Sequence, residues 1–223
     1  METMSLPLNY NYLSTYVSMG YNLPEKIAKS IFKRQNEFVA GRLCAVNALE
    51  KLTGKKFFVG QDGMGRPVWP DNVVGSITHT DDIVIAGVAK SEKYVSIGID
   101  LEKIIDSSDI IASLEQSILV GKEKALISKM DKTKYIMCLY LFFSFKESLY
   151  KCLKPITKKM FSFEAAEVIY VNYKNRIAHI RLVEDLNSNF TKGFLLTGRF
   201  KYMQDINHIF TSVAILNTMC SCT

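Results

Sequence analysis

Apolar residues recur at helical spacing in two separate parts of the chain. From Pro24 to Leu52 they recur at roughly helical spacing, and Gly54 stands where such a helix would end. The apolar stripe changes phase around Lys33–Asn36, so we expect a break there. A second helical pattern, later in the chain, strengthens into a helix over about Thr133–Leu153, with Pro155 expected just beyond its end.

Strand-like runs follow each helical region. An irregular loop rich in glycine and proline occupies residues 60–70, and Asp81-Asp82 suits the turn of a hairpin between the first two runs. Helices grouped ahead of strands favour an α+β fold over a wound α/β sheet. The predicted strands are Val73–His79, Ile83–Ala89, Val95–Leu101, Val168–Tyr173, Ile177–Leu182, Gly193–Tyr202 and His208–Leu216.

The order of helix, loop and strands occurs twice, which predicts two similar halves. With 223 residues, 48% of them hydrophobic, the chain has enough apolar material for one sizeable core or for two small lobes that share an interface. We predict an N-terminal lobe over residues 1–93 and a C-terminal lobe over residues 94–223. Lys and Arg outnumber Asp and Glu by 28 to 22, a net charge of +6, which favours anionic partners unless it is simply a solvated surface.

Several classes of protein are disfavoured by the composition. Five cysteines without a C-x-x-C pair, and three histidines, suggest neither a disulfide framework nor a zinc site. The uncharged stretch over residues 3–24 lacks a basic start and is interrupted by Pro7 and Gly20, unlike an export signal. The most apolar run, Tyr135–Phe143, is far shorter than the roughly 20 residues that span a bilayer. We therefore expect a cytoplasmic protein with no membrane span, and no basic patch interleaved with aromatics marks a nucleic-acid binder.

Two acids end the third predicted strand. Asp100 and Glu102 are two residues apart, so both side chains point to one face of a strand. Their repulsion is costly unless a cation or basic groups lie between them. Oxygen ligands at a partly open site suit Mg²⁺, which keeps several waters and often binds substrate phosphates as well. The alternative is an exposed strand end with two solvated acids.

Glu147 and Lys151 are four residues apart on the second predicted helix and so share one face. They are either a surface ion pair or a carboxylate that binds metal or takes a proton beside an ammonium that meets a phosphate. His79 and Thr78 end the first strand, where they would hydrogen-bond a phosphate, although a lone histidine is more often structural.

Three arginines have the chemistry of phosphate ligands. Arg66 lies in the stiff segment Gly65-Arg66-Pro67-Val68-Trp69-Pro70, and a guanidinium matches phosphate oxygens well. The alternative is a rigid loop in which Trp69 packs as an anchor. Arg34 and Arg42 are eight residues apart on the first helical region, close enough in phase to face one ligand, or simply water.

The order and spacing of these motifs resemble the large, monomeric 4′-phosphopantetheinyl transferases that serve surfactin and enterobactin synthetases. The motifs lie between residues 34 and 151, and the C-terminal third adds only a strand pattern. The matching segments are Gly41-Arg42, Gly65-Arg66-Pro67-Val68-Trp69-Pro70, Gly75-Ser76-Ile77-Thr78-His79, Gly98-Ile99-Asp100-Leu101-Glu102 and Phe143-Ser144-Phe145-Lys146-Glu147-Ser148-Leu149-Tyr150-Lys151.

The resemblance implies a pseudo-symmetric monomer of two α+β lobes with coenzyme A in the cleft between them. It also implies Mg²⁺-dependent transfer of the phosphopantetheine group to a serine of an acyl or peptidyl carrier protein. The acids that match the family's Mg²⁺ site are Asp100, Glu102 and Glu147. The residues that match its coenzyme A contacts are Arg34, Arg42, Arg66, Thr78, His79, Lys146 and Lys151.

In this reading Glu147 takes the serine proton, while Lys151 and His79 stabilise the leaving 3′,5′-ADP. The alternative is a non-catalytic relative that binds carrier proteins or nucleotides, which the loss of a metal-site acid would favour. All three matching acids are present. The pathway stays open: siderophore or other nonribosomal peptide, polyketide or fatty acid synthesis.

Overall fold

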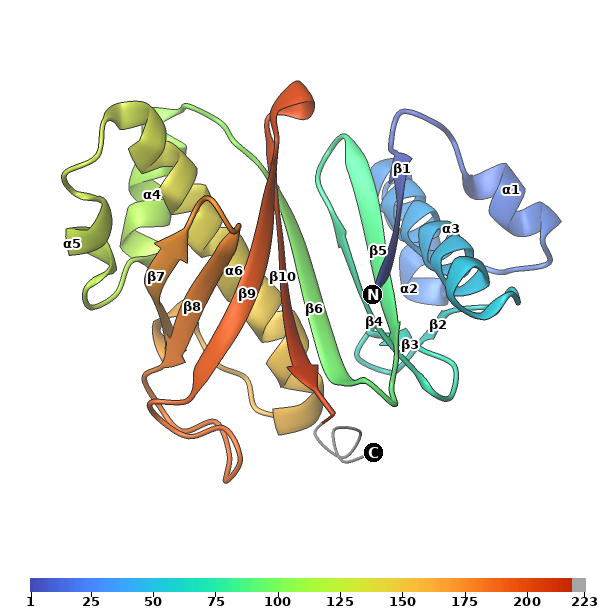
Figure 1. Ribbon diagram of the computed structural model, residues 1–223. Helices are drawn as coiled ribbons and strands as arrows, with labels where there is room; N and C mark the ends of the chain where they lie inside the picture. The colour runs from blue at the N-terminus through green and yellow to red at the C-terminus, as the bar shows by residue number, and fades with distance from the viewer. Residues whose placement is uncertain (218–223) are drawn as a thin grey trace. The chain divides into compact units, whose positions relative to one another are not determined.

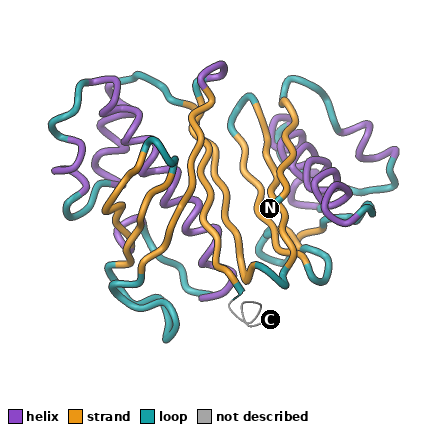
Figure 2. Tube along the Cα trace, in the orientation of Figure 1, coloured by secondary structure: helices purple, strands orange, loops and turns teal. Residues whose placement is uncertain are grey.

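The structure is a computed structural model that describes residues 1–217. The chain forms two compact units, one made of Met1–Ile97 with residues 216 and 217, the other of Gly98–Ile215. Each unit combines a long helix with a β-sheet (Figures 1 and 2), and the pairs β1–β5, β4–β5, β7–β8, β8–β9 and β9–β10 are antiparallel. The predicted α+β fold is confirmed. The lobe boundary at residues 93/94 stays a prediction.

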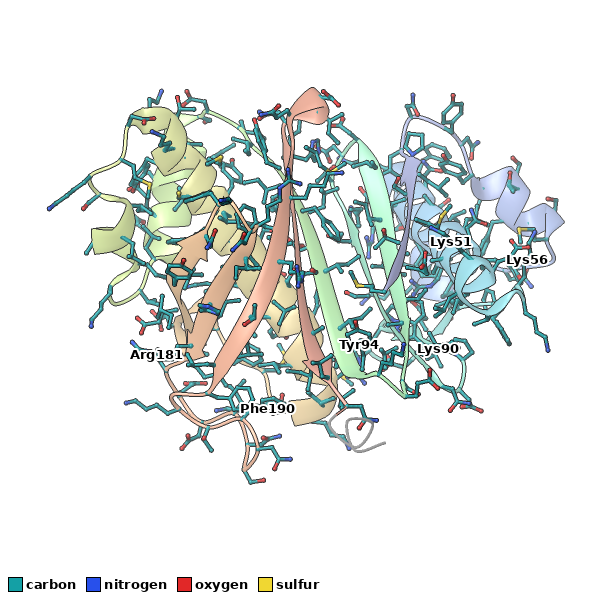
Figure 3. The ribbon with its side chains drawn as sticks, viewed as in Figure 1. Lys51, Lys56, Lys90, Tyr94, Arg181 and Phe190 are labelled. Carbon is teal, nitrogen blue, oxygen red and sulfur yellow. The ribbon has the colours of Figure 1, made fainter. Side chains whose placement is uncertain are left out.

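The first unit packs helix α3 (Phe32–Thr53) on a three-stranded sheet in the order β1-β5-β4, in which β5 pairs antiparallel with both neighbours. Its core includes Cys44, Leu49 and Val88, all fully buried. At the far end of α3, the Lys51 ammonium lies 2.8 Å from a carboxylate oxygen of Glu2 in β1 (Figure 3). The other elements of this unit are β1 (Glu2–Pro7), α1 (Leu13–Ser18), α2 (Glu25–Ala28), β2 (Gly60–Gln61), β3 (Pro67–Val68), β4 (Val73–His79) and β5 (Ile83–Lys90).

The predicted first helix is interrupted, but earlier than its apolar phase suggested. The break falls at residues 29–31, between α2 and α3, and Lys33–Asn36 lies inside α3. Ile31 has an extended backbone at the N-cap, which resets the helix axis before the long apolar stripe begins. At the other end Gly54 adopts φ 75° and donates its N–H to the Glu50 carbonyl, the helix stop that the sequence predicted.

The second unit packs helix α6 (Lys132–Thr157) against a five-stranded sheet in the order β6-β10-β9-β8-β7 (Figure 1). The strands β4, β8 and β10 match their predicted bounds, and the other predicted strands are displaced by a few residues at their ends. The remaining elements are β6 (Tyr94–Lys103), which begins in the first unit, α4 (Ser108–Ile118), α5 (Glu123–Ile127), η1 (Phe163–Ala165), β7 (Ala166–Asn172), β8 (Ile177–Leu182), β9 (Leu195–Met203), η2 (Gln204–Ile206) and β10 (His208–Leu216).

Two glycines let α6 approach the sheet closely. A Cβ atom on Gly98 of β6 would overlap the backbone oxygen of Ser148, and one on Gly198 of β9 would overlap the Phe145 ring. Any side chain at Gly98 would therefore push α6 away from β6. This contact fixes the distance between the two elements that carry the predicted acids.

The predicted position of Pro155 relative to α6 is wrong, because the helix continues through it to Thr157. A proline in the last turn removes a single N–H from the helical ladder, a small loss compared with one in mid-helix. Lys158 then ends the helix with φ 57° and donates its N–H to the Lys154 carbonyl.

The sequence pattern also missed β1 and α1 near the N-terminus. β1 is only six residues long and only every second residue of it is partly buried, so no continuous apolar run marked it in the sequence. Across residues 1–217, none of the helices is long and apolar enough to cross a lipid bilayer.

Candidate functional site

The end of β6 and one face of α6 bring four predicted site residues together in the second unit. Asp100 is 2% exposed, and Glu102, next on the same side of the strand, is half-buried. From α6, the Lys151 ammonium lies 2.7 Å from Oδ1 of Asp100. Lys151 thus pairs with an acid on β6. A surface ion pair with Glu147 within α6, the alternative that the sequence left open, would not bring it there.

The three carboxylates of this acidic cluster, Asp100, Glu102 and Glu147, act on one another electrostatically. Burial first, and then the charges of Asp100 and Glu147, raise the pKa of Glu102 to about 8, while Lys151 opposes the shift. Burial, followed by the charge of Asp100, also raises the pKa of Glu147. If all three carboxylates were ionised, their negative charge would exceed what the single ammonium beside them can balance.

A divalent cation fits this donor set. Carboxylate oxygens are the ligands that Mg²⁺ prefers, and Mg²⁺ usually binds through a few carboxylates while keeping several waters. Within residues 1–217, no three His, Cys, Asp or Glu side chains converge into a ready-made metal cage. The cluster thus has the chemistry of an open site completed by water and substrate oxygens.

A pocket of about 320 Å³ adjoins Glu147 on the same unit. Its walls are mainly aromatic and aliphatic, so it suits an uncharged, partly apolar group. The lining residues are Lys146, Glu147, Leu149, Tyr150, Phe161, Ser162, Phe163 and Ala166.

Lys146 is directed away from the acidic cluster into a buried ion pair. Its ammonium lies 2.8 Å from Oε2 of Glu123 and also donates to the Ile118 carbonyl, and both charged side chains are almost fully buried. Burial lowers the pKa of Lys146 and raises that of Glu123. Glu123 also accepts the N–H of Val168, so the pair ties α5 and β7 to α6. The contact between Lys146 and coenzyme A that the family resemblance implies stays a prediction.

In the first unit, the structure brings Arg34 and His79 together around Glu37. Nη1 of Arg34 lies 3.3 Å, and Nε2 of His79 lies 3.9 Å, from the same Oε2 of Glu37. Thr78, the preceding residue of β4, is buried. The sequence did not single out Glu37. Its i,i+3 spacing from Arg34 indicates at most a helical ion pair, and nothing in the sequence places His79 beside it.

Arg42 is a buried cation on α3. It is 5% exposed, its guanidinium lies 4.5 Å from the centre of the Phe38 ring, and its Nε has no hydrogen-bond partner within the described part of the chain. Burial lowers the pKa of Arg42 to about 10. A buried donor without an acceptor is rare in proteins, so an anionic ligand would suit this group.

Arg66 is held within its own loop. Its Nε and Nη2 each lie 2.7 Å from Oδ2 of Asp62, and Oδ1 of Asp62 accepts backbone N–H groups of the same turn. The structure therefore fixes Arg66 to the tip of the β2–β3 hairpin. Asp62, which sequence analysis missed, is the residue that directs it.

Two family models match the chain. Residues 23–89 match the 4′-phosphopantetheinyl transferase N-terminal domain, and residues 96–196 match the 4′-phosphopantetheinyl transferase superfamily. Together the two matches reach from α2 to the start of β9.

Curated relatives give the same description. The 4′-phosphopantetheinyl transferase Npt of Nocardia iowensis is 33% identical over 144 residues, which are 65% of this chain and 63% of that protein. PptT of Mycobacterium tuberculosis is 33% identical over 66% of this chain and 65% of its own length. Enterobactin synthase component D of Salmonella typhi is 30% identical over 66% of this chain and 60% of its own length. The chain thus spans less than two thirds of the length of each of these relatives.

A solved holo-(acyl-carrier-protein) synthase from Bacillus anthracis aligns with 56% of this chain and 99% of its own, at 15% identity and a TM-score of 0.38. That similarity is too distant to bear on function.

Proposed function

Because the chain belongs to the 4′-phosphopantetheinyl transferase superfamily, we propose that it transfers the 4′-phosphopantetheine group of coenzyme A to a serine of an apo acyl or peptidyl carrier protein. The products would be the holo carrier protein and 3′,5′-ADP. The family predicted from the motifs is confirmed by the two family models. The observation that carries the proposal is the acidic cluster beside Lys151, since it offers a cation site and a base in one place.

We assign Asp100, Glu102 and Glu147 as the residues that would hold Mg²⁺. When bound, the cation would neutralise charge on the pyrophosphate oxygens and on the three carboxylates. The raised pKa values of Glu102 and Glu147 support this assignment, because both burial and, after it, the neighbouring carboxylates disfavour the ionised form, and a bound cation would offset these costs.

Glu147 is the group that we expect to take the proton of the carrier serine, directly or through one water. Burial, the largest cause of its raised pKa, does not depend on the cation and favours uptake of a proton by this carboxylate. The serine oxygen then forms a bond to the phosphorus that carries the pantetheine arm, while the bond from that phosphorus to the bridging oxygen breaks. Lys151 and His79 would stabilise the charge that develops on the leaving 3′,5′-ADP.

The cationic residues of the first unit fit the anionic nucleotide end of coenzyme A. Nε of Arg42 is a buried donor with no acceptor among residues 1–217, and Arg34 is half-exposed beside Glu37. Arg66 and Thr78 complete the proposed contacts. The net charge of +6 suits an anionic cosubstrate and an acidic carrier surface. We further propose that the protein acts as a cytoplasmic monomer.

Intact mass of apo-carrier proteins tests the proposal. The protein is incubated with coenzyme A, Mg²⁺ and carriers from siderophore, other nonribosomal peptide, polyketide and fatty acid systems. At least one carrier should gain the mass of a phosphopantetheine group, and EDTA should prevent the gain. No mass gain on any carrier would contradict the proposed activity.

Two variants test the assigned roles in the same assay. Glu147→Gln should lower kcat by about 10²-fold, the size of a lost general base, and Asp100→Asn should abolish Mg²⁺-dependent transfer. Lys134→Ala, which removes an exposed ammonium from the first turn of α6, is the matched control and should leave kcat unchanged. A near-normal kcat in Glu147→Gln would contradict the mechanism but not the family.

A further inference from the structure

Glu37 lies between two residues that the proposed function assigns to coenzyme A. We propose that Glu37 is a positioning residue of this site: its carboxylate holds Arg34 and His79 in the geometry that coenzyme A meets. The inference rests on the proposed function and adds a residue that the motifs do not include.

One oxygen of Glu37 serves both neighbours. Oε2 lies 3.3 Å from Nη1 of Arg34, within hydrogen-bond reach, and 3.9 Å from Nε2 of His79, within ion-pair reach. The Glu37 side chain is 12% exposed, whereas those of Arg34 and His79 are 50% and 37% exposed. The carboxylate thus lies on the inner side of the trio, and both basic groups keep exposed surface for a ligand.

The residues around Glu37 contact two other segments of the first unit. The side chain of Asn36, the preceding residue, donates to the Tyr10 carbonyl at 2.8 Å and accepts the Tyr12 N–H at 2.9 Å. Lys33, one turn earlier on α3, lies 2.6 Å from Oδ1 of Asp81 in the β4–β5 turn. The Asn36 contacts thus tie α3 to the loop after β1, and the exposed Lys33–Asp81 pair joins α3 to the turn that follows the strand carrying His79.

Gly41 lets α3 come close enough to β4 for this contact. A Cβ atom there would lie 3.3 Å from Cγ2 of Ile77, a distance tighter than ordinary packing. Since Ile77 is two residues before His79, this close approach also brings the end of β4 toward Glu37. The Glu37 carboxylate therefore lies where it restricts the Arg34 and His79 side chains before coenzyme A binds.

Electrostatics and positioning predict opposite effects of removing this charge. A carboxylate near a phosphate repels it, so losing the negative charge would by itself strengthen coenzyme A binding. Losing the positioning contact would instead free the Arg34 side chain. Coenzyme A would then have to order this side chain on binding, which would weaken its affinity. The sign of the change in affinity therefore distinguishes the two effects.

Glu37→Gln keeps the size of the side chain while removing its charge. We expect it to raise the KM for coenzyme A and its calorimetric Kd about tenfold, the lower end of what a charge-assisted hydrogen bond contributes. The kcat should also fall, by less than about tenfold, because His79 contributes to leaving-group stabilisation, whereas the KM for the carrier protein should change by less than about twofold. Glu25→Gln, which breaks an exposed pair between α2 and Lys29, the residue that follows it, is the matched control and should change neither constant.

A variant cycle tests whether Glu37 acts through Arg34. If it does, Glu37→Gln should add little to the effect of Arg34→Ala, and additive effects would overturn that route. Melting curves detect a folding defect in Glu37→Gln; Glu37→Asp, which keeps the charge, is then the second variant and should bind coenzyme A better than Glu37→Gln. Unchanged or tighter binding in Glu37→Gln would overturn the inference while wild-type transfer stands. A wild-type protein that binds no coenzyme A would overturn the proposed function, and the inference with it.

Discussion

At the residue scale, Glu102 is the carboxylate of the acidic cluster whose ionised form is most disfavoured. Its pKa is raised to about 8, first by burial and then by Asp100 and Glu147, so near neutral pH the folded chain holds a proton that the unfolded chain releases. Proton uptake on folding means that stability falls as pH rises between the two pKa values. In the absence of metal, the site is therefore destabilising at the pH where a transferase would work.

The Glu102→Gln variant should show this cost directly. With metal removed by EDTA, the wild-type melting temperature should fall relative to the variant as pH rises from about 5 to 8, because ionisation of Glu102 in the folded state becomes progressively more costly. Below about pH 4.5 the two proteins should melt at similar temperatures. Differential scanning calorimetry at several pH values measures the difference.

Glu92→Gln is the control for that experiment, since Glu92 is an exposed residue beside Lys90. Its melting temperature should follow the wild type at every pH. A constant offset between wild type and Glu102→Gln from pH 5 to 8 would mean that Glu102 is ionised throughout this range, and that the charge crowding described above is absent.

At the element scale, the site depends on how closely β6 and α6 pack. Gly98 of β6 lies against the backbone of Ser148, one residue after Glu147. The same strand carries Asp100 and Glu102, so a change in the distance between strand and helix would move all three acids relative to one another. The glycine in the Gly98-Ile99-Asp100-Leu101-Glu102 motif thus has a packing role that is separate from the chemistry of its acids.

Gly98→Ala should therefore destabilise the protein and disable the site. The new methyl group would overlap backbone atoms that cannot rotate away, so we expect a loss of about 3 kcal/mol or more in the free energy of unfolding, at or above the upper end for overpacking. Urea denaturation measures the loss. Gly63→Ala, where a Cβ atom would meet nothing within 4 Å, should change stability by less than about 0.5 kcal/mol. Equal stability of Gly98→Ala and the wild type would contradict the close approach.

Most elements were predictable because their periodicity is strong. The strands β4, β8 and β10 alternate or are continuously apolar between clear turn residues, and Gly54 marks the end of α3. The exceptions have local physical reasons. A proline costs little in the last turn of a helix, so Pro155 did not end α6, and β1 was missed because its edge position leaves half of its residues exposed.

At the scale of the whole molecule, the sequence predicted which residues to consider but not their partners. Asp100 and Glu102 share a strand face by periodicity alone, whereas the 2.7 Å contact between Asp100 and Lys151 joins residues 51 positions apart. Lys146 and Glu147 are adjacent in sequence, yet successive helical residues point about 100° apart, and Lys146 enters a buried pair with Glu123. Long-range packing decides such partners, and spacing rules do not contain it.

Ligand binding should stabilise the whole chain in a manner that identifies the cation site. A ligand at about 100 times its Kd adds roughly 2.7 kcal/mol to the stability of the folded state, or about 5–10 °C in melting temperature for a chain of this size. Coenzyme A with Mg²⁺ should therefore raise the melting temperature by more than the sum of the two separate effects, because each reduces the electrostatic cost of binding the other.

In Asp100→Asn the increment that depends on Mg²⁺ should be lost, while the shift from coenzyme A alone remains, since the basic residues of the first unit are intact. Thermal melts with coenzyme A, Mg²⁺, both or EDTA measure these increments. An equal shift by coenzyme A in Mg²⁺ and in EDTA would show that the acidic cluster does not bind the cation.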